Sequence, residues 1–297
     1  MTYSIVARDP ATGALGVAVQ SGTFGVGAMV PWAQAGVGAV ATQAFTEPAY
    51  GPRCLAALAA GADAPAALEQ ATAADQDALI RQVGVVAADG TAAARTGAWC
   101  IDHAGHRLGG GFAVQANMMA SPRVWPAMAA AFGPASGPFP RRLLAALAAA
   151  QQAGGDARGV MSAALVVVAA EPAESWAGRL VDVRVDRSTD PLGELDRLCT
   201  ASDAYTRFGQ AVGELSAGDA SAALASVDAG LAELPGEENL LFLQAGALLA
   251  SGDAEQARAG LRTLLARRPA WEIIVRSFAA KGLLMLPPGT SLDSLLA

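Results

Sequence analysis

The pattern of hydrophobic and polar positions predicts an N-terminal region in which strands and helical pairs alternate. Short apolar runs in "YSIVAR" and "LGVAVQS" are separated by "DPATGA", a cluster of Asp, Pro and Gly, and together they predict a β-hairpin. Further segments of strand length occupy residues 27–32, 36–42, 82–89, 92–97, 111–117, 164–170 and 180–186. The three segments between 82 and 117 read as a meander, with Asp89-Gly90 as a hairpin turn.

Helical patterns interrupt these strands in pairs. The Ala/Leu-rich stretch 50–73 is broken by "GADAP", so a second helix is expected to open after Asp63 and Pro65. Two more helices are expected at 122–132 and 140–153. Strand groups separated by helical pairs favour an α+β fold in which helices cover sheets, and we expect one such domain over residues 1–189.

The remainder, residues 190–297, is expected to be entirely helical and repetitive. Asp190 is expected to cap a helix with Pro191 in the first helical position. Equivalent residues recur 34 positions apart, as in Gly218 with Gly252 and in Leu215 with Leu249. This is the period of tetratricopeptide helix pairs, so we expect a TPR-like tail, although a simple helical bundle is the alternative. Such repeats commonly present a surface to a protein partner or to a second copy.

Composition excludes several classes of partner. The formal net charge is −7 and Lys281 is the single lysine, so we expect no nucleic-acid binding. No uninterrupted apolar run reaches the roughly 18 residues of a membrane-spanning helix, and no signal peptide is expected before the first strand, which predicts a soluble cytoplasmic protein. Cys54, Cys100 and Cys199 read as small buried hydrophobic residues, and no metal site or cofactor is expected.

Few side chains offer chemistry. The two histidines, His103 and His106, fall in "DHAGHRLGGG", a glycine-rich connection between strands, and no motif supports a serine or cysteine triad. Thr2 remains, because a small second residue permits removal of Met1. Its hydroxyl is then a nucleophile, and its own amine, with a pKa of about 7.7 to 8.0, is a base at neutral pH. The alternative is that Thr2 has no catalytic role and occurs there only because threonine is favoured in β-strands.

Longer motifs point to a family. The segments "TYSIVARDPATGALGVAVQSG", "VPWAQAGVGAVATQAF", "YGPR", "GHR" and "GFAVQANMMA" closely resemble the DUF1028 family over residues 2–195. This resemblance implies the fold of the N-terminal nucleophile (Ntn) hydrolases, a four-layer αββα sandwich. In the related proteasome-type sequences the second strand ends in an acid followed by serine. Gln20 and Ser21 match those positions here, so the acid is absent, as is any lysine before Lys281.

The resemblance also implies site residues. Six motif positions are expected near a cleft at the strand ends: Gln43, Thr46, Tyr50, His106, Gln115 and Asn117. The side-chain amides of Gln115 and Asn117, or backbone N–H groups at the helix start near 46–51, are candidate donors to an oxyanion. His106 is an alternative proton shuttle to the Thr2 amine. Equally, Gln115 and Asn117 could bridge two sheets, and Gln43 and Tyr50 could position the first helix.

These observations give two functional hypotheses. The first is a hydrolase of a small non-peptide amide, in which Thr2 attacks and His106, Gln115 and Asn117 assist, while Gln20, Ser21, Gln43, Thr46 and Tyr50 bind the substrate. The second is a non-catalytic Ntn-type protein that binds a ligand or serves as a scaffold, with the tail binding a partner or a second copy. A retained Met1 would favour the second.

Overall fold

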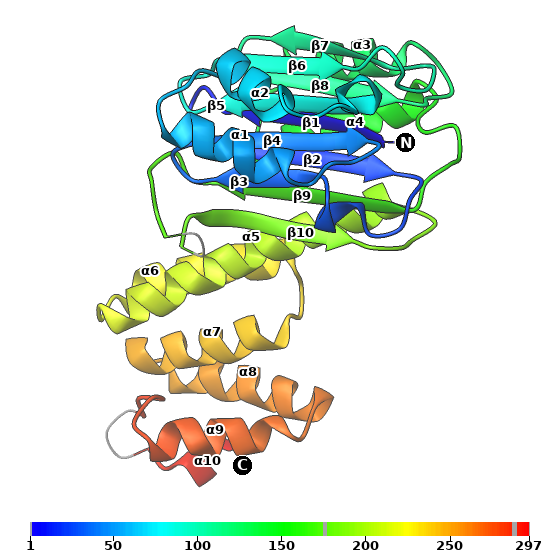
Figure 1. Cartoon of the computed structure of the whole chain (residues 1–297). Helices are drawn as coiled ribbons and strands as arrows, with labels where there is room; N and C mark the ends of the chain where they lie inside the picture. Colours follow the sequence, from blue (N-terminus) through cyan, green and yellow to red (C-terminus); the bar gives the residue numbers. More distant parts are fainter. Residues whose placement is uncertain (1, 175–176, 287–289, 297) are drawn as a thin grey trace. The chain divides into compact units, whose positions relative to one another are not determined.

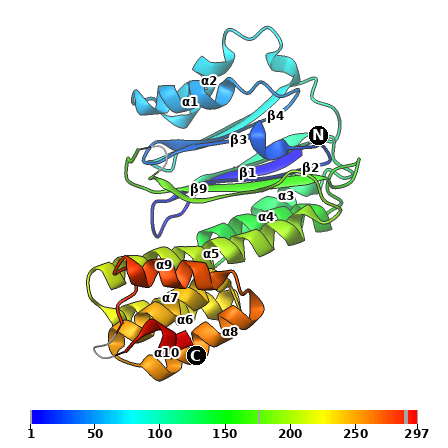
Figure 2. The ribbon, with the colours of Figure 1, turned by 90° about the horizontal axis from the view of Figure 1, so that it is seen from below.

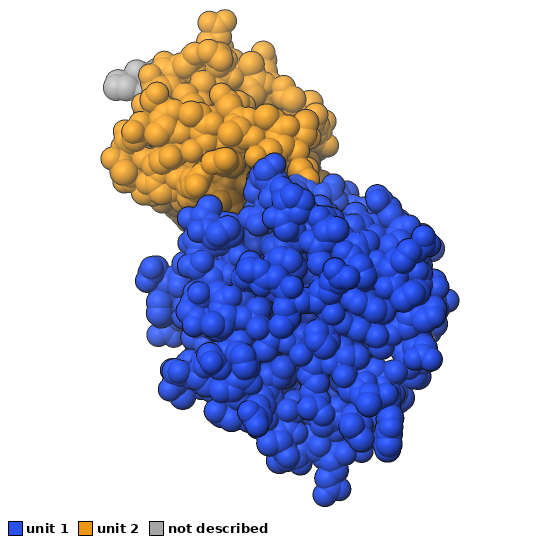
Figure 3. Space-filling model, turned by 90° about the horizontal axis from the view of Figure 1, so that it is seen from above, with its two compact units in different colours: residues 1–199 blue, residues 200–297 orange. Residues whose placement is uncertain are grey.

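The computed structural model describes residues 2–174, 177–286 and 290–296. Contacts within the chain divide it into two compact units, residues 1–199 and 200–297 (Figure 3). The division falls inside helix α5 (Pro191–Ser216), whereas the predicted domain boundary at 189/190 lies just before the start of that helix. Met1, on which the N-terminal nucleophile hypothesis depends, lies outside the described residues.

The first unit contains a six-stranded antiparallel sheet in the order β10-β9-β2-β1-β8-β7 (Figure 1). Its strands are β1 (Thr2–Arg8), β2 (Leu15–Ser21), β7 (Gly105–Gly109), β8 (Phe112–Asn117), β9 (Ser162–Val168) and β10 (Arg179–Val185). The predicted hairpin is confirmed, because β1 and β2 pair from Thr2 opposite Ser21 to Arg8 opposite Leu15. On its other side β1 pairs with β8, which places Asn117 opposite Thr2.

A four-stranded antiparallel sheet faces the first, in the order β3-β4-β5-β6. Its strands are β3 (Pro31–Gln34), β4 (Gly38–Ala44), β5 (Arg81–Ala87) and β6 (Ala92–Thr96). The hairpin turn at Asp89-Gly90 joins β5 to β6 as predicted, with Gly90 at a φ of 90°. The predicted meander is wrong, however. Strand β8 belongs to the other sheet, because the chain crosses between sheets after β6, which strand periodicity cannot reveal.

Two further strand predictions need correction. The strand predicted at 27–32 is shifted toward the C-terminus: β3 begins only at Pro31, and a 3-10 turn (η1, Val26–Ala28) occupies the first predicted residues. A Cβ on Gly27 would lie 2.7 Å from the Cβ of Ala164. This turn therefore packs closely against β9. The glycine-rich stretch that contains the histidines is not only a connection, because residues 105–109 form strand β7 and His106 lies within it.

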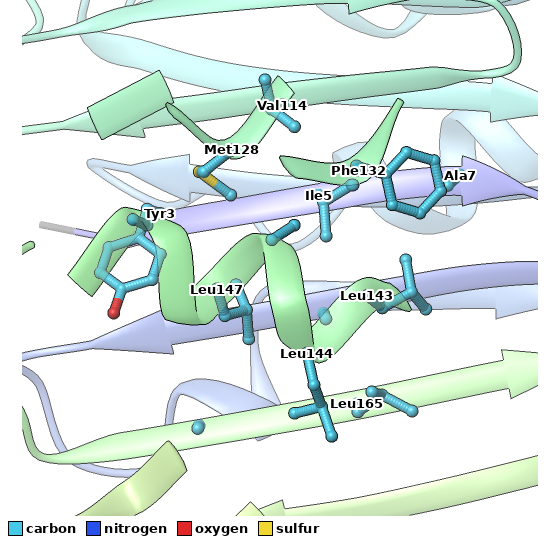
Figure 4. Packing of buried hydrophobic residues seen from close by; sticks show 14 of the residues in the cluster. Tyr3, Ile5, Ala7, Val114, Met128, Phe132, Leu143, Leu144, Leu147 and Leu165 are labelled. Carbon is cyan, nitrogen blue, oxygen red and sulfur yellow. The ribbon is translucent and has the colours of Figure 1, made fainter. Parts of the chain in front are cut away.

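Helical pairs cover the outer faces of the two sheets (Figure 2). Helices α1 (Tyr50–Ala59) and α2 (Ala64–Thr72) pack on the four-stranded sheet, and the short turn η2 (Ala78–Ile80) leads into β5. Helices α3 (Val124–Phe132) and α4 (Phe139–Gln152) pack on the six-stranded sheet, where Leu143 and Leu147 meet Ile5 and Leu165 (Figure 4). Helix α2 begins directly after Asp63, whose carboxylate caps it by accepting from the Ala66 N–H at 2.8 Å, while Pro65 lies inside its first turn.

A third apolar cluster fills the space between the sheets. It includes Val6, Val17 and Val19 from the six-stranded sheet, and Ala39 and Val86 from the four-stranded sheet. Together with the two outer clusters it produces a helix-sheet-sheet-helix layering in this unit. The expected mixed α+β architecture, followed by an all-helical region, is therefore confirmed.

The second unit consists of helices. The C-terminal half of α5 is followed by α6 (Ala220–Glu233), α7 (Glu238–Ser251), α8 (Ala254–Arg267), α9 (Trp271–Ala280) and α10 (Leu292–Leu296). Helices α6 and α8 begin and end 34 residues apart, and each is capped by an aspartate, Asp219 or Asp253, that accepts from a first-turn N–H. The cap of α5 is also as predicted, because Asp190 accepts from the Gly193 N–H at 3.0 Å.

Within the described residues, none of the helices combines the length and the apolar character needed to cross a bilayer. All three cysteines are buried, and burial raises the pKa of the Cys54 thiol to about 12. That thiol is therefore protonated at neutral pH, in keeping with its predicted role as a buried hydrophobic residue.

Candidate functional site

The layer between the two sheets is apolar at one end and polar at the other. Alternate residues of a strand share a face, so Thr2 and Ser4 on β1 lie in the same layer as Val6. The polar end collects buried side chains from both sheets: Thr2, Ser4, Ser21, Gln43, Gln82, Gln115 and Asn117. Side chains from five different strands thus meet where β1 begins.

The backbone carbonyl of Thr2 is held by two side-chain amides from different sheets. Gln43 Nε2 donates to it at 3.0 Å from β4, and Asn117 Nδ2 donates to it at 3.3 Å from β8. Both amides also donate to Gln82 Oε1, at 2.7 and 3.0 Å. Because buried hydrogen bonds polarise one another and fix geometry, this network fixes the position of the first peptide group of β1.

The hydroxyl of Thr2 points to β2. Its Oγ1 donates to Ser21 Oγ at 3.1 Å, and the backbone N–H of Thr23 donates to the same Ser21 oxygen at 3.2 Å. Thr2 is only 5% exposed in this structure. The nucleophile predicted from the sequence is therefore ordered and paired, and it lies beneath the surface.

A small cavity of about 220 Å³ adjoins this end of β1. Its lining residues are Thr23, Ala44, Phe45, Ile101, Asn117, Met118 and Arg158. Asn117 belongs both to this lining and to the network around the Thr2 carbonyl, so the cavity and the network share a wall.

Backbone conformation marks the same cavity. Ala44 has a φ of 72° and Met118 a φ of 60°, and these are the two non-glycine residues with positive φ among those that the structure describes. Ala44 is the last residue of β4 and Met118 directly follows β8, so they mark strand ends from the two sheets, and both line the cavity. A left-handed backbone costs a non-glycine residue about 1 kcal/mol or more, and such strain gathers at functional sites.

Arg158 supplies positive charge to the cavity wall. A carboxylate behind it, that of Asp156, is fully buried and contacts Arg158 Nη2 at 3.2 Å. The N–H of Gly22 donates to the same carboxylate at 2.8 Å, and Arg158 Nη1 donates to Thr23 Oγ1 at 3.0 Å. The side chain of Arg158 remains 35% exposed. Asp156 thus fixes a guanidinium at the edge of the cavity.

Gln20 does not face this cavity, contrary to the expectation that it binds substrate. It lies opposite Tyr3 on β1, and Tyr3 faces the α3/α4 side, where its hydroxyl donates to Gln151 Oε1 at 2.9 Å. Gln20 is buried on that side, and neither polar atom of its side chain has a hydrogen-bond partner. Adjacent residues on a strand point to opposite faces, so Ser21 reaches the polar layer and Gln20 cannot.

Tyr50 and Thr46 are also outside the cavity lining. The Tyr50 hydroxyl donates to Asp75 Oδ2 at 2.5 Å on the helix-covered side of the four-stranded sheet, so Tyr50 anchors α1. The backbone N–H groups of Tyr50 and Gly51 donate to the carbonyls of Glu47 and Pro48, each at 3.1 Å. Those N–H groups are therefore engaged within the turn and do not form the expected oxyanion site.

His106 is separated from Thr2 by strand β8. It lies opposite Gln115 on β7, and its Nδ1 is 2.8 Å from Thr96 Oγ1. With neighbouring strands about 4.8 Å apart, direct proton transfer between His106 and Thr2 is ruled out. The link is indirect, because Gln82 Nε2 donates to Thr96 Oγ1 at 2.8 Å. Burial lowers the pKa of His106.

The amides of Gln115 and Asn117 are engaged inside the protein. Gln115 Nε2 donates to Ser4 Oγ at 2.6 Å, and the side chain packs on Gly84, where a Cβ would lie 2.2 Å from Gln115 Oε1. Asn117 Nδ2 donates to Thr2 O and to Gln82 Oε1, which accounts for both of its hydrogens. The structure therefore matches the bridging alternative for these two residues better than the oxyanion role.

Sequence reasoning missed four residues of the site. Ser4 and Gln82 interrupt otherwise apolar strands, in "YSIVA" and "QVGVVA". A polar residue in a strand that is otherwise buried could have indicated that these two side chains belong to a polar site. Asp156 and Arg158 lie in an irregular segment between α4 and β9, and no local pattern brings them to β1.

Comparison with known proteins places this fold in a family. The family model described as "Family of unknown function (DUF1028)" matches residues 2–195. The chain is also similar to a solved structure, protein SPO2555 from Silicibacter pomeroyi, described as belonging to the same family model. The two share 34% sequence identity with a TM-score of 0.61, over 66% of this chain and 84% of that one. No curated protein matches. The chain belongs to the DUF1028 family.

Proposed function

We propose that this protein is an Ntn-type hydrolase of a small non-peptide amide, with Thr2 as its nucleophile. The observation that carries the proposal is the fixation of Thr2 at the start of β1. Two amides hold its carbonyl, and its hydroxyl contacts Ser21 beside a cavity with a strained backbone. A nucleophile needs such support from packed neighbours.

The proposed reaction requires a chain that begins at Thr2. Its free amine accepts the Oγ1 proton while Oγ1 bonds to the substrate carbonyl carbon, which gives a tetrahedral oxyanion. The C–N bond then breaks, the proton passes to the leaving amine, and an ester to Thr2 remains for water to hydrolyse. The Ser21 hydroxyl, 3.1 Å from Thr2 Oγ1, is placed to relay the proton between oxygen and amine.

The cavity limits the substrate. A volume of about 220 Å³ admits a small molecule, and Phe45 and Ile101 offer apolar contacts at its entrance. Arg158 is the positive group at the cavity wall and takes the oxyanion role in this proposal, because the side-chain amides of Asn117 and Gln115 donate within the polar layer. His106 has no part in this mechanism, because β8 separates it from Thr2.

One observation favours the second candidate, a non-catalytic Ntn-type ligand-binding or scaffold protein. Thr2 is 5% exposed and is absent from the cavity lining, so its hydroxyl meets no ligand in this conformation. In either case we propose that the helical tail is a pair of TPR-like repeats that binds a protein partner or a second copy. The 34-residue offset between α6 and α8 supports that repeat.

A library of small amides tests the first candidate. Amine release is followed by mass spectrometry for the wild type, Thr2→Ala, Thr2→Ser and, as a matched control, Thr206→Ala, which alters an exposed threonine of α5. We expect turnover by the wild type and the control, reduced turnover by Thr2→Ser, and none by Thr2→Ala. Turnover by Thr2→Ala equal to that of the wild type would refute the mechanism and leave the non-catalytic ligand-binding or scaffold function as the remaining candidate.

A further inference from the structure

A second cleft lies along the open edges of the two sheets, away from the Thr2 cavity. It has a volume of about 680 Å³ and runs between α2 and the edge strands β6 and β7. Leu68 from α2 and Leu108 from β7 form apolar walls, and Arg95, Thr96 and His106 also line it. Edge strands contact each other here, so residues of both sheets face one space.

Arg95 is the unusual group in this cleft. The residue is half-buried, its Nε is shielded from solvent, and that nitrogen has no hydrogen-bond partner. No ion pair of Arg95 occurs among the residues described, although other arginines, such as Arg81 and Arg142, pair with aspartates. Shielding even part of an unpaired guanidinium from water is costly. An unpaired guanidinium in a cleft is therefore a candidate anion site.

His106 adds a second donor. Thr96 Oγ1 accepts a hydrogen bond from Gln82 Nε2, so its single hydroxyl proton is available for His106 Nδ1, 2.8 Å away. On this balance of donors and acceptors we assign the proton of the neutral imidazole to Nε2. Lowering of the His106 pKa by burial agrees with a neutral ring. The group that His106 offers to a ligand is then an N–H.

We propose that this cleft binds a small organic oxyanion, a carboxylate or a phosphate ester. Its charged group is held by the Arg95 guanidinium, a second acceptor oxygen lies against His106 Nε2, and its carbon skeleton packs on Leu68 and Leu108. Adjacent residues of a strand point to opposite faces, so Arg95 and Thr96 lie on opposite faces of β6. His106 is bonded to Thr96 and therefore lies on the Thr96 side. A ligand that contacts both Arg95 and His106 spans the edge of β6. Glu69 at the rim is exposed, so solvent screens its charge.

Binding of an anion in this cleft does not require catalysis by Thr2, yet the two sites are connected. Thr96 contacts Gln82 Nε2, and Gln82 Oε1 accepts from Gln43 and Asn117, the two residues that hold the Thr2 carbonyl. A ligand that fixes His106 and Thr96 is therefore linked to the hydrogen-bond network that holds the candidate nucleophile.

The imidazole signals provide a direct test on the full chain, because it contains only two histidines, His103 and His106. The protein is titrated with succinate and, separately, with inorganic phosphate to about 10 mM, tenfold above a dissociation constant of about 1 mM. We expect a saturable shift of the His106 signal with at least one probe, while His103 stays unchanged. Saturation by succinate alone identifies a carboxylate site, and saturation by phosphate alone a phosphate site. Absence of a saturable His106 shift with both probes overturns the proposal.

A matched pair of variants assigns the binding to Arg95. Arg95→Gln and Arg107→Gln change the net charge equally, and Arg107 is an exposed neighbour of His106 on β7. We expect Arg95→Gln to weaken binding at least about tenfold and Arg107→Gln to leave it unchanged. Equal weakening by both variants, or by neither, contradicts the assignment. If Arg95→Gln does not fold, Arg95→Lys, which keeps the charge but loses the planar fork, is expected to weaken binding in its place.

Discussion

The side-chain oxygens of Thr2 and Ser21 lie 3.1 Å apart across the first hairpin, and both are buried. Ser21 Oγ also accepts from the Thr23 N–H, so one serine supports both the candidate nucleophile and the turn that reaches Arg158. Ser21→Ala leaves both donors without this acceptor. We expect a loss of about 1 to 3 kcal/mol in the free energy of unfolding.

That change is measured by urea-induced unfolding, with Ser251→Ala as the control, because Ser251 is exposed near the end of α7. The control is expected to cost under about 0.5 kcal/mol. In the hydrolase account, turnover by Ser21→Ala also falls, since the proton relay to the amine is lost. Full stability together with full turnover in Ser21→Ala would show that the serine supports neither.

Gln82 is the centre of the polar layer. It accepts from Gln43 and Asn117 and donates to Thr96 and to the Ala116 carbonyl. Gln82→Leu keeps similar volume but leaves these buried groups unsatisfied, so we expect a loss of about 3 to 5 kcal/mol in the free energy of unfolding. Gln70→Leu on the exposed face of α2 is the control and should be nearly neutral. A similar, small effect of both variants would contradict a cooperative network.

The carboxyl group of Asp75 is expected to make the free energy of unfolding depend on pH. Its hydrogen bond from Tyr50 holds the pKa of its carboxyl below the ordinary range, with Arg81 acting in the same direction. The unfolded chain therefore binds more protons in acid, so this stabilisation is complete above about pH 4 and is lost as pH falls through the lowered pKa of the folded state.

Tyr50→Phe removes the main cause of that shift. Its difference in stability from the wild type is expected to be largest near neutral pH and to shrink in acid, as measured by urea unfolding between about pH 7 and pH 2.5. Tyr205→Phe, which removes a hydroxyl bonded to Glu237 in the tail, is the control. A Tyr50→Phe difference that stays constant across this range would rule out the coupling.

Substitution of two helix caps in the tail tests whether α6 and α8 belong to equivalent repeats. Asp219 and Asp253 occupy equivalent positions, and their carboxylates accept from the N–H groups of Ala222 and Gln256 at 2.9 and 3.0 Å. Alanine at either position should cost about 1 kcal/mol in helix stability. Amide hydrogen exchange of the first turn of α6 and of α8 measures this locally. Comparable loss of protection at the two sites is expected, and a marked difference would speak against equivalent repeats.

Local patterns predicted the elements that depend on local chemistry. The first hairpin follows from the turn residues after Arg8, and the start of α5 follows from Asp190 and Pro191. The equivalence of α6 and α8 was visible as spacing. The pairing of β8 with β1 was not, because strand alternation carries no information on which sheet a strand joins, so the predicted meander failed.

The site was partly predictable for the same reason. The motif resemblance implied correctly that five polar residues meet: Thr2, Ser21, Gln43, Gln115 and Asn117. Gln20 was expected among them, but it is one residue away from Ser21 on β2 and therefore points to the opposite face of the sheet. Arg158 could not be predicted, since its position depends on the buried Asp156 carboxylate and on the Gly22 turn, which are contacts between distant segments. His106 was assigned to the wrong cleft because two intervening strand pairings separate it from Thr2.

The central claim is that Thr2 acts with a free amine, and the intact mass of untagged protein tests it most directly. The account predicts a mass that lacks one methionine residue, with N-terminal sequencing that begins Thr-Tyr-Ser. A population that retains Met1 throughout would contradict it, because the amine of Thr2 would then be part of a peptide bond and could not accept the proton.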